Sequence, residues 1–213
     1  MKLRLLALAA TAATALVASS ANAAIVYAFI PGGASPVGGF TVIDTFDNTI
    51  GVTGSNFQIK VPPSDGNGAP PANSIPSGTA YLSVLGGGSA TYTFAGDVGA
   101  FEFDWGSVDS YNTLTINSTG GSPIVVPGLS FANAADGNQV SAGTNGLFRV
   151  AGTAGERFNS ITFSSGQNSF EVDNLAVAGV PEPASWALMI LGFGGAGAAL
   201  RSQRRRPAAA ATA

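Results

Sequence analysis

The sequence contains no cysteine and no histidine among its 213 residues. Without cysteine the chain has no disulfide bond, no thiol nucleophile and no thiolate ligand for a metal ion. Without histidine it has neither a Ser-His-Asp triad nor the usual ligands of a zinc site. These absences exclude the cysteine- and histidine-based classes of catalytic and zinc site.

Basic residues are scarce in the long middle part of the chain. Between positions 24 and 180 only Lys60, Arg149 and Arg157 are basic, and three basic against 11 acidic residues give this body a formal charge of −8. The whole chain has a net charge of −3, because the other six basic residues lie near its two ends. An acidic body repels phosphate groups, so we expect no binding to nucleic acid, whereas divalent cations are attracted.

The first 23 residues have the features of a secretory signal peptide. Lys2 and Arg4 precede an uncharged apolar run. Ala21 and Ala23 then place small residues at the two positions that determine cleavage. We therefore predict an N-terminal signal helix, cleavage after Ala23 by the secretion machinery, and an exported domain of residues 24–179.

Residues 184–200 form an uncharged, glycine-rich apolar segment that is followed directly by arginines. Its 17 residues are at the lower limit for a membrane-spanning helix, and its glycines lower its helix propensity. We predict a C-terminal hydrophobic helix that inserts transiently into the inner membrane. Under the positive-inside rule the arginines stay on the cytoplasmic side, so the body upstream lies outside.

The residues around this apolar segment form a sorting motif. The pattern resembles the PEP-CTERM sorting signal, in the variant that reads Pro-Glu-Pro-x-x-Trp-Ala, and it spans residues 180–206. The resemblance implies an exosortase, a membrane-embedded cysteine protease that cleaves near the Pro-Glu-Pro sequence and delivers the body to the outside of the envelope. A plain single-pass membrane anchor is the alternative, and residues 207–213 are expected to be a disordered tail. The motif residues are Val180, Pro181, Glu182, Pro183, Trp186, Ala187, Arg201, Arg204, Arg205 and Arg206.

Between the two targeting segments the sequence has the pattern of an all-β protein. Short runs of Val, Ile, Thr, Phe and Tyr alternate with clusters of Gly, Asn, Ser and Pro. About nine strands fit two packed antiparallel sheets, which together form a jelly-roll-like β-sandwich. Residues 62–78 contain five prolines and are expected to form an exposed loop. The predicted strands are residues 40–46, 56–61, 80–85, 91–95, 100–105, 111–117, 146–151, 159–164 and 169–177.

The most regular pattern is the alternation from Phe101 to Trp105. Phe101, Phe103 and Trp105 share one face of a strand, so we expect them in the core. Glu102 and Asp104 share the other face, and we interpret them as solvated. The alternative is a catalytic pair, because glycoside hydrolases use two carboxylates a few ångströms apart. The turn-forming residues that follow predict a hairpin with the next strand.

The last predicted strand changes its phase in the middle. Phe170 and Leu175 have opposite phases, so a regular strand cannot bury both side chains. A β-bulge at Asp173 and Asn174 would bring both into the core. The strand is similar to the last strand of jelly-roll modules that bind carbohydrate, in which a nearby acidic residue often helps to hold a structural calcium ion.

Four oxygen-bearing side chains beside strands are candidate ligands of such a calcium ion, namely Asp173, Asn174, Asp44 and Asp47. Asp44 has the phase of the inward-facing residues of its strand, where an unpaired carboxylate is costly. It would need an arginine, a cation or a local bulge. The alternative, which we favour, is that Ile43 faces the core instead. No cofactor other than this calcium ion is expected.

Together these features predict an exported protein that is held briefly in the inner membrane and then released or attached at the cell surface. We expect a non-catalytic body with a structural or adhesive role among the exopolysaccharides of a biofilm or extracellular matrix. A carbohydrate-binding module and a carboxylate-based hydrolase are the alternatives. The expected partners are the secretion machinery, the exosortase and extracellular polysaccharide.

Overall fold

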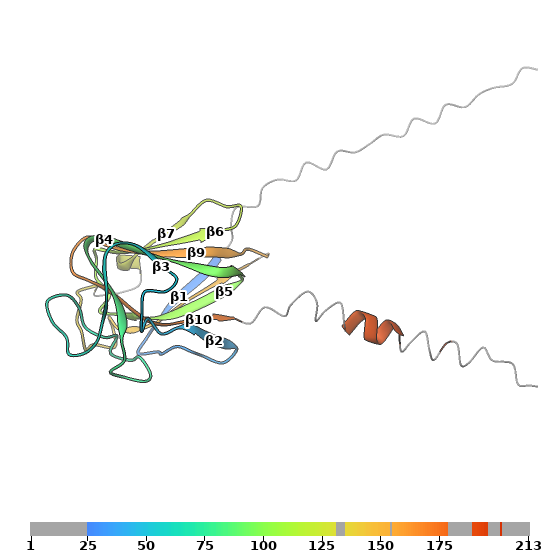
Figure 1. Ribbon diagram of the computed structural model, residues 1–213, viewed down its shortest axis with the longest axis horizontal. Coiled ribbons are helices and arrows are strands. Elements are labelled where there is room, and N and C mark those ends of the chain that lie inside the picture. The colour runs from blue at the N-terminus through green and yellow to red at the C-terminus, as the bar shows by residue number, and fades with distance from the viewer. Residues whose placement is uncertain (1–24, 131–134, 154, 179–188, 196–200, 202–213) are drawn as a thin grey trace, which may run out of the picture.

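The body, whose sequence alternates between apolar and polar residues, folds into ten antiparallel strands (Figure 1). The computed structural model describes residues 25–130, 135–153, 155–178, 189–195 and 201. A 3-10 turn, Gly128–Ser130, follows the seventh strand. The strands are β1 (Ile25–Pro31), β2 (Phe40–Asp44), β3 (Val52–Lys60), β4 (Tyr81–Val98), β5 (Ala100–Gly106), β6 (Asn112–Ser118), β7 (Ile124–Pro127), β8 (Gly146–Gly152), β9 (Phe158–Ser165) and β10 (Phe170–Ala178).

The strands pair in the order β1-β8-β5-β10-β4-β9-β6-β7, with β2 beside β10 and β3 beside β4. The 18-residue strand β4 connects two layers, because Val84 in its first part pairs with Phe170 of β10, whereas Thr91 in its second part pairs with Thr162 of β9. One layer contains β1, β8, β5, β10 and β2, and the other contains β9, β6 and β7 (Figure 1). The predicted antiparallel β-sandwich is confirmed.

The strand count differs from the expected nine for two reasons. The segments predicted at 80–85 and 91–95 are parts of the one strand β4, because the glycines between them continue the strand. Gly88 lies directly against the backbone carbonyl of Asn56 on β3, where a Cβ atom would clash, so glycine permits the close approach of two strands there. The strands β1 and β7 were not predicted, since β1 follows the signal segment and β7 has only four residues.

An aromatic cluster fills the space between the layers. Phe101, Phe103 and Trp105 are fully buried, as their alternation predicted. Phe103 contacts Phe163 of the opposite layer edge to face, with ring centroids 5.2 Å apart, and Trp105 stacks on Phe170 at 4.4 Å. Such pairs add about 0.5–1.5 kcal/mol each beyond the area that they bury.

The hairpin predicted between β5 and β6 is wrong. β5 pairs with β8 and β10, whereas β6 pairs with β7 and β9. The turn between them contains Ser107, whose φ is +38°, and it takes the chain from one layer to the other. Turn-forming residues thus marked the end of a strand correctly, but they do not determine which strand becomes the partner.

The loop that joins β3 to β4 is mostly exposed, as its prolines predicted, but part of it packs against the sheet. Ala69, Pro71 and Ser74 are buried against the outer face of β5 and β10, although most residues around them are exposed. The loop is therefore a cover for one face of the sheet, and this position determines the surroundings of several carboxylates.

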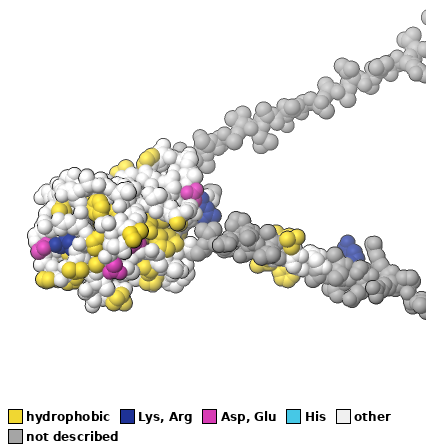
Figure 2. Space-filling view, viewed as in Figure 1, with side chains coloured by type: hydrophobic (Ala, Val, Ile, Leu, Met, Phe, Trp, Pro, Cys, Tyr) yellow, Lys and Arg dark blue, Asp and Glu magenta, His cyan; other side chains and the backbone are white. Residues whose placement is uncertain are grey.

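The targeting segments lie largely outside the described residues. This applies to the signal peptide with Ala21 and Ala23, and to the motif residues except Arg201. In the predicted hydrophobic segment, residues 189–195 are helical, and Figure 2 colours their apolar side chains yellow. Within the part of the chain that the structure describes, no helix is long and apolar enough to span a membrane.

Candidate functional site

Four carboxylates lie on the face of β5 and β10 that points away from the aromatic core. Glu102 and Asp104 belong to β5, and Glu171 and Asp173 belong to β10. All four are at most 2 % exposed, so the expectation that Glu102 and Asp104 are solvated is wrong. The reason is that the β1–β2 and β3–β4 loops cover this face. We call these four residues the acid layer.

Glu102 is the member of the acid layer that has a cationic partner. The Nε of Arg149 donates to its Oε2 at 2.8 Å, and the backbone N–H of Val37 donates to its Oε1 at 2.7 Å. The guanidinium also lies over the ring of Phe40, 4.7 Å from its centroid. These contacts attach the β1–β2 loop to the sheet.

Asp104 and Asp173 have hydrogen-bond donors but, within the described part of the chain, no basic partner. Asp104 accepts hydrogen bonds from the N–H of Ser35 at 2.6 Å and from the hydroxyl of Ser74 and the amide of Asn174, both at 2.9 Å. Burial raises the pKa of Asp104 to about 6, although these bonds oppose the shift. Burial likewise raises the pKa of Asp173 to about 7, and the nearby charge of Asp104 adds to the effect.

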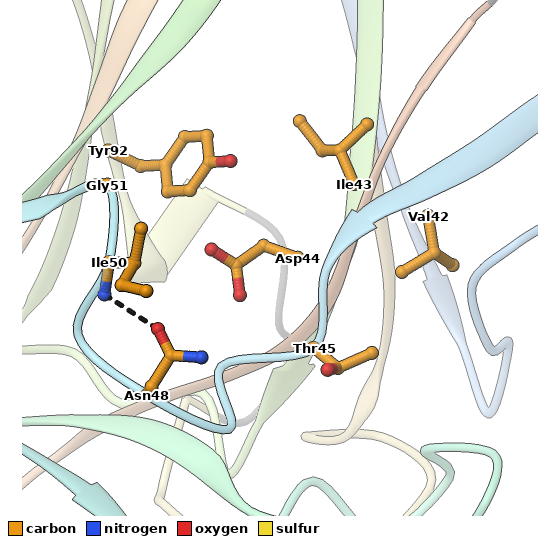
Figure 3. A pocket seen from close by; sticks show the side chains of 8 residues that line it. All are labelled: Val42, Ile43, Asp44, Thr45, Asn48, Ile50, Gly51 and Tyr92. Atoms are coloured by element: carbon orange, nitrogen blue, oxygen red, sulfur yellow. Dashed lines mark hydrogen bonds between the residues drawn. The ribbon is translucent and has the colours of Figure 1, made fainter.

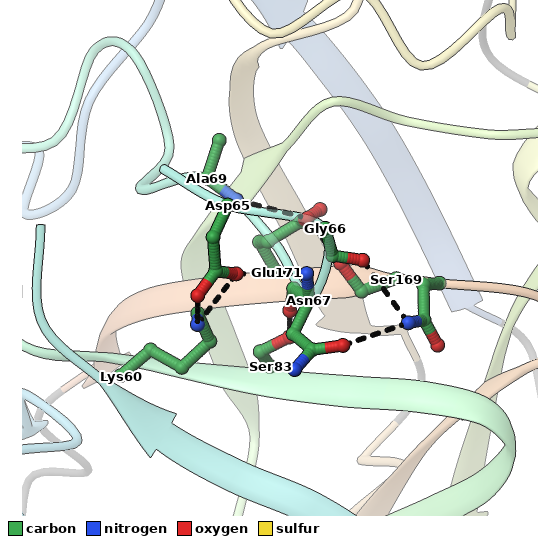
Figure 4. Close-up of polar contacts among 9 residues, drawn as sticks. Lys60, Asp65, Gly66, Asn67, Ala69, Ser83, Ser169 and Glu171 are labelled. Carbon is green, nitrogen blue, oxygen red and sulfur yellow. Dashed lines mark hydrogen bonds and ion pairs between the residues drawn. The ribbon is translucent and has the colours of Figure 1, made fainter. Parts of the chain in front are cut away.

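Glu171 holds the first part of the β3–β4 loop against the sheet (Figure 4). It accepts hydrogen bonds from the hydroxyls of Ser107 and Ser169 and from the N–H of Ala69. Near it, Lys60 forms an ion pair of 2.7 Å with the exposed Asp65. The acid layer thus holds loops in place. Because Glu102 and Asp104 are buried and already bonded, they do not present a catalytic pair to a substrate.

A small polar pocket lies where these loops meet the end of the sandwich. Its volume is about 190 Å³. The hydroxyl of Tyr111 donates to the backbone carbonyl of Asn168 at 2.8 Å across this region, and burial raises the pKa values of Tyr111 and Asp109. The pocket is lined by Asp65, Gly66, Gly68, Ser107, Asp109, Tyr111, Asp136, Gly137, Gln139, Asn168, Ser169 and Glu171.

A larger pocket, of about 410 Å³, lies between the β2–β3 connection and β4, and we call it the Asp44 pocket (Figure 3). It combines apolar walls with a few polar groups. The carboxylate of Asp44 points toward the space between Tyr92 and Asn48. Its lining residues are Val42, Ile43, Asp44, Thr45, Asn48, Ile50, Gly51 and Tyr92.

The inward direction of Asp44 corrects the interpretation that favoured Ile43. Ile43 is 41 % exposed, whereas Asp44 is half-buried. The carboxylate is tolerated because the N–H of Phe46 donates to its Oδ1 at 2.7 Å, and because the pocket gives it contact with water. Partial burial raises the pKa of Asp44, and the charge of Asp47 raises it further.

The four calcium candidates do not form one cluster. Asp44 lines its pocket, and Asp47 is exposed and accepts a hydrogen bond from Thr45 at 2.6 Å. Asp173 and Asn174 instead contact the β3–β4 loop, where the Asn174 amide donates to the carbonyl of Ile75 at 3.2 Å. Among the described residues, no three acidic side chains lie close enough to hold a metal ion together.

The predicted bulge in β10 is present. The pairing of β10 with β5 shifts its register between Asp173 and Ala176, and Asn174 has a φ of +49°. The shift lets Phe170 and Leu175 both enter the core. It also directs the Asn174 amide to Asp104, so the bulge that corrects the apolar phase supplies a donor to the acid layer.

The chain thus consists of an all-β sandwich domain and a C-terminal segment that carries a signal. The family model of the PEP-CTERM protein-sorting motif matches residues 179–206. The chain therefore carries this sorting motif, as the sequence pattern indicated. No protein of curated function matches the sequence.

Three solved structures show a distant likeness. A carbohydrate-binding module of lichenase 5A from Cellvibrio mixtus, in complex with cellotriose, has 14 % identity and a TM-score of 0.35 over 66 % of this chain and 99 % of that chain. A module from Clostridium stercorarium, in complex with cellobiose, has 16 % identity and a TM-score of 0.34 over 70 % and 97 %. An exo-beta-1,3-galactanase from Phanerochaete chrysosporium has 20 % identity and a TM-score of 0.32 over 58 % and 26 %. With TM-scores below 0.5, these likenesses transfer neither a fold family nor a ligand to this chain.

Proposed function

We propose that this protein is exported, processed at its C-terminal motif by an exosortase, and delivered to the cell surface or the extracellular space. The observation that carries the proposal is the position of the motif. It begins at residue 179, directly after β10 ends at Ala178. A cut near Pro181 to Pro183 would therefore remove the hydrophobic segment and the arginines without removing a strand.

The processed body is suited to a non-catalytic role among exopolysaccharides. Its outer β4–β9–β6 face carries no charged side chain in the three central cross-strand rows. One of these rows consists of Thr91, Thr162 and Thr115, and the hydroxyls of Thr91 and Thr162 lie 2.8 Å apart. A neutral, hydroxyl-rich surface can exchange hydrogen bonds with uncharged polysaccharide, which supports a structural or adhesive role.

The sorting step is tested with a paired substitution in the native host. Replacing both Pro181 and Pro183 with alanine changes the core of the motif, whereas Pro207→Ala changes a proline beyond the arginines and serves as the control. We expect the double variant to stay in the membrane fraction with its tail attached and the control to be processed like the unaltered chain. Equal fractionation of the two variants would contradict the proposal.

A second function, binding of a neutral sugar, is favoured by the Asp44 pocket. Apolar side chains such as Val42 and Ile50 can cover the C–H face of a pyranose ring, while Asp44 and Asn48 accept hydrogen bonds from its hydroxyls. The carboxylate disfavours an anionic sugar. Ile50 is 79 % exposed, so it has apolar surface that a ligand would remove from water.

Binding is tested by isothermal titration calorimetry with neutral oligosaccharides. Asp44→Asn keeps the shape of the side chain but weakens its acceptor strength, and the exposed Asp97→Asn is the control, since Asp97 does not line the pocket. We expect about a tenfold loss of affinity for Asp44→Asn alone. Binding that both variants retain fully would exclude this pocket as the site.

A further inference from the structure

The first and the last strand of the body meet the two targeting segments at the same end of the sandwich. β1 begins at Ile25, which pairs with Gly152 at the end of β8. β10 ends at Ala178, and its Val177 pairs with Phe101 near the start of β5. The end of β8 lies beside the start of β5, so both termini of the body are on one side (Figure 1). We call this side the terminal end, and its turns contain residues 37–39, 95–99, 119–123 and 155–157.

The connections from the terminal end to the predicted apolar segments are short. The C-terminal apolar segment begins at residue 184, six residues after Ala178, and the apolar run of the signal segment ends seven residues before Ile25. An extended chain covers at most about 3.6 Å per residue, so these connections reach about 22 and 25 Å. A body of this length has a radius of gyration of about 15 Å and a diameter of about 40 Å. A membrane that holds either segment is therefore within reach of the terminal end only.

The composition of the terminal end fits contact with lipid headgroups. Glycine is the commonest residue in its turns, so few bulky side chains separate the backbone from a flat surface. Its charged residues are Asp97, Glu156 and Arg157. Arg157 is exposed and, among the described residues, it has no carboxylate partner, whereas Lys60 and Arg149 each form an ion pair. The guanidinium of Arg157 can therefore meet a headgroup phosphate.

We propose that the terminal end lies against the lipid headgroups while the C-terminal segment is held in the membrane. This inference rests on the proposed export and sorting, and it adds the lipid surface as a partner of the body. The opposite end of the sandwich then faces away from the membrane. That end holds the polar pocket, which includes Ser107 just after β5 and Ser169 just before β10. The pocket is thus presented to the outside before the body is released.

The absence of cysteine from the chain makes this orientation measurable. A single introduced cysteine is the only site for a maleimide reagent, and its rate of reaction depends on its accessibility. Gly96 is exposed at the terminal end, and there is open space where its Cβ would lie. Val140 is 84 % exposed in the connection that leads to Gly146, the first residue of β8, so it lies at the opposite end. Gly96→Cys and Val140→Cys therefore form a matched pair.

The experiment labels both variants with a bulky, membrane-impermeant maleimide in spheroplasts of the native host that lack the exosortase. Each variant is compared with a version that carries about 40 Gly and Ser residues inserted after Ala178, a spacer with a mean reach of about 35 Å. We expect the spacer to speed the labelling of Gly96→Cys about fivefold and to change that of Val140→Cys less than twofold. Circular dichroism of the purified chains verifies that each variant is folded.

A spacer that leaves the labelling of Gly96→Cys unchanged, or that speeds both variants equally, would overturn the proposal. Because the exosortase is absent, it cannot be the cause of any shielding. The test is also separate from that of processing. If the unaltered chain is never cut, the proposed sorting fails although the labelling pattern is present, and if the chain is cut but the pattern is absent, only the orientation is wrong.

Discussion

Asp104 of β5 and Asp173 of β10 are direct cross-strand neighbours in the register of the sheet, and each is only 1 % exposed. No basic side chain contacts either of them among the described residues, since Arg149 is bonded to Glu102. Two carboxylates in this position repel each other when both are charged, and this repulsion together with burial favours their protonated forms. The pair therefore makes the stability of the body depend on pH.

We predict that the body is less stable at pH 8 than at pH 5. The folded-state pKa values of about 6 for Asp104 and about 7 for Asp173 lie above that of an unfolded aspartate, so the folded state binds more protons between these values. The stability that protonation provides is fully present below about pH 4 and is lost as pH rises through 6 to 7.

The measurement is urea unfolding at several pH values. Asp173→Asn removes the charge and keeps the size of the side chain, so we expect it to raise the free energy of unfolding at pH 8 by on the order of 3 kcal/mol and to have little effect at pH 4. Asp97→Asn, at an exposed position, is the control. A stability gain for Asp173→Asn that is the same at both pH values would contradict the explanation.

The ion pair between Glu102 and Arg149 leads to a second prediction. Arg149→Met removes the guanidinium from the ring of Phe40 and leaves the fully buried Glu102 without a cation. We expect a loss of about 3 kcal/mol in the free energy of unfolding, and a smaller loss when Glu102→Gln is added, because the buried charge is then absent. A double variant no more stable than Arg149→Met would show that the loss has another cause.

The contact between the layers leads to a third prediction. Phe103 touches Phe163 and Phe148, both at centroid distances of 5.2 Å, and it has no exposed surface. Phe103→Ala should lower the free energy of unfolding by about 3–5 kcal/mol through the cavity that it leaves. Val140→Ala, at a side chain that is 84 % exposed, should change it by less than about 0.5 kcal/mol. If both substitutions lowered the free energy of unfolding by similar amounts, Phe103 would not belong to the core that stabilises the fold.

Calcium binding stays a prediction, and the structure indicates which of the four candidate ligands to substitute in a test. Asp173 and Asn174 are engaged with the β3–β4 loop, whereas Asp44 and Asp47 lie close enough for their charges to interact. If these two hold the ion, calcium in large excess raises the Tm, Asp44→Asn abolishes the increase and Asp173→Asn retains it. A Tm that is the same in calcium and in a chelator would exclude a calcium ion that stabilises the fold.

The sequence predicted those features that depend on local alternation. Phe101, Phe103 and Trp105 were assigned to the core because a strand has a period of two, and the bulge at Asp173 was found because the apolar phase changes there. The same rule indicated that Asp44 points inward. The preference for Ile43 was wrong because the pattern contains no signal for the pocket that makes an inward carboxylate tolerable.

Features that depend on contacts between distant segments were not predictable in this way. The burial of Glu102 depends on Ser35 and Val37, and that of Asp104 depends on Ser74, all of which belong to loops. Periodicity gives the two faces of a strand but does not show which loop covers the outer one. Tyr92 of β4 was likewise not predicted to line a pocket. The other side of this pocket is formed by Asn48 and Ile50 of the β2–β3 connection, which are distant from Tyr92 in the sequence.

Processing at the C-terminal motif can be measured by the intact mass of the protein purified from its native host, with and without the exosortase. We expect a species that begins at Ala24 and ends between Pro181 and Pro183, present at the surface or in the medium only when the exosortase is present. A species in unaltered cells that still carries the residues from Arg201 to Arg206 would contradict it and would identify the segment as a permanent membrane anchor.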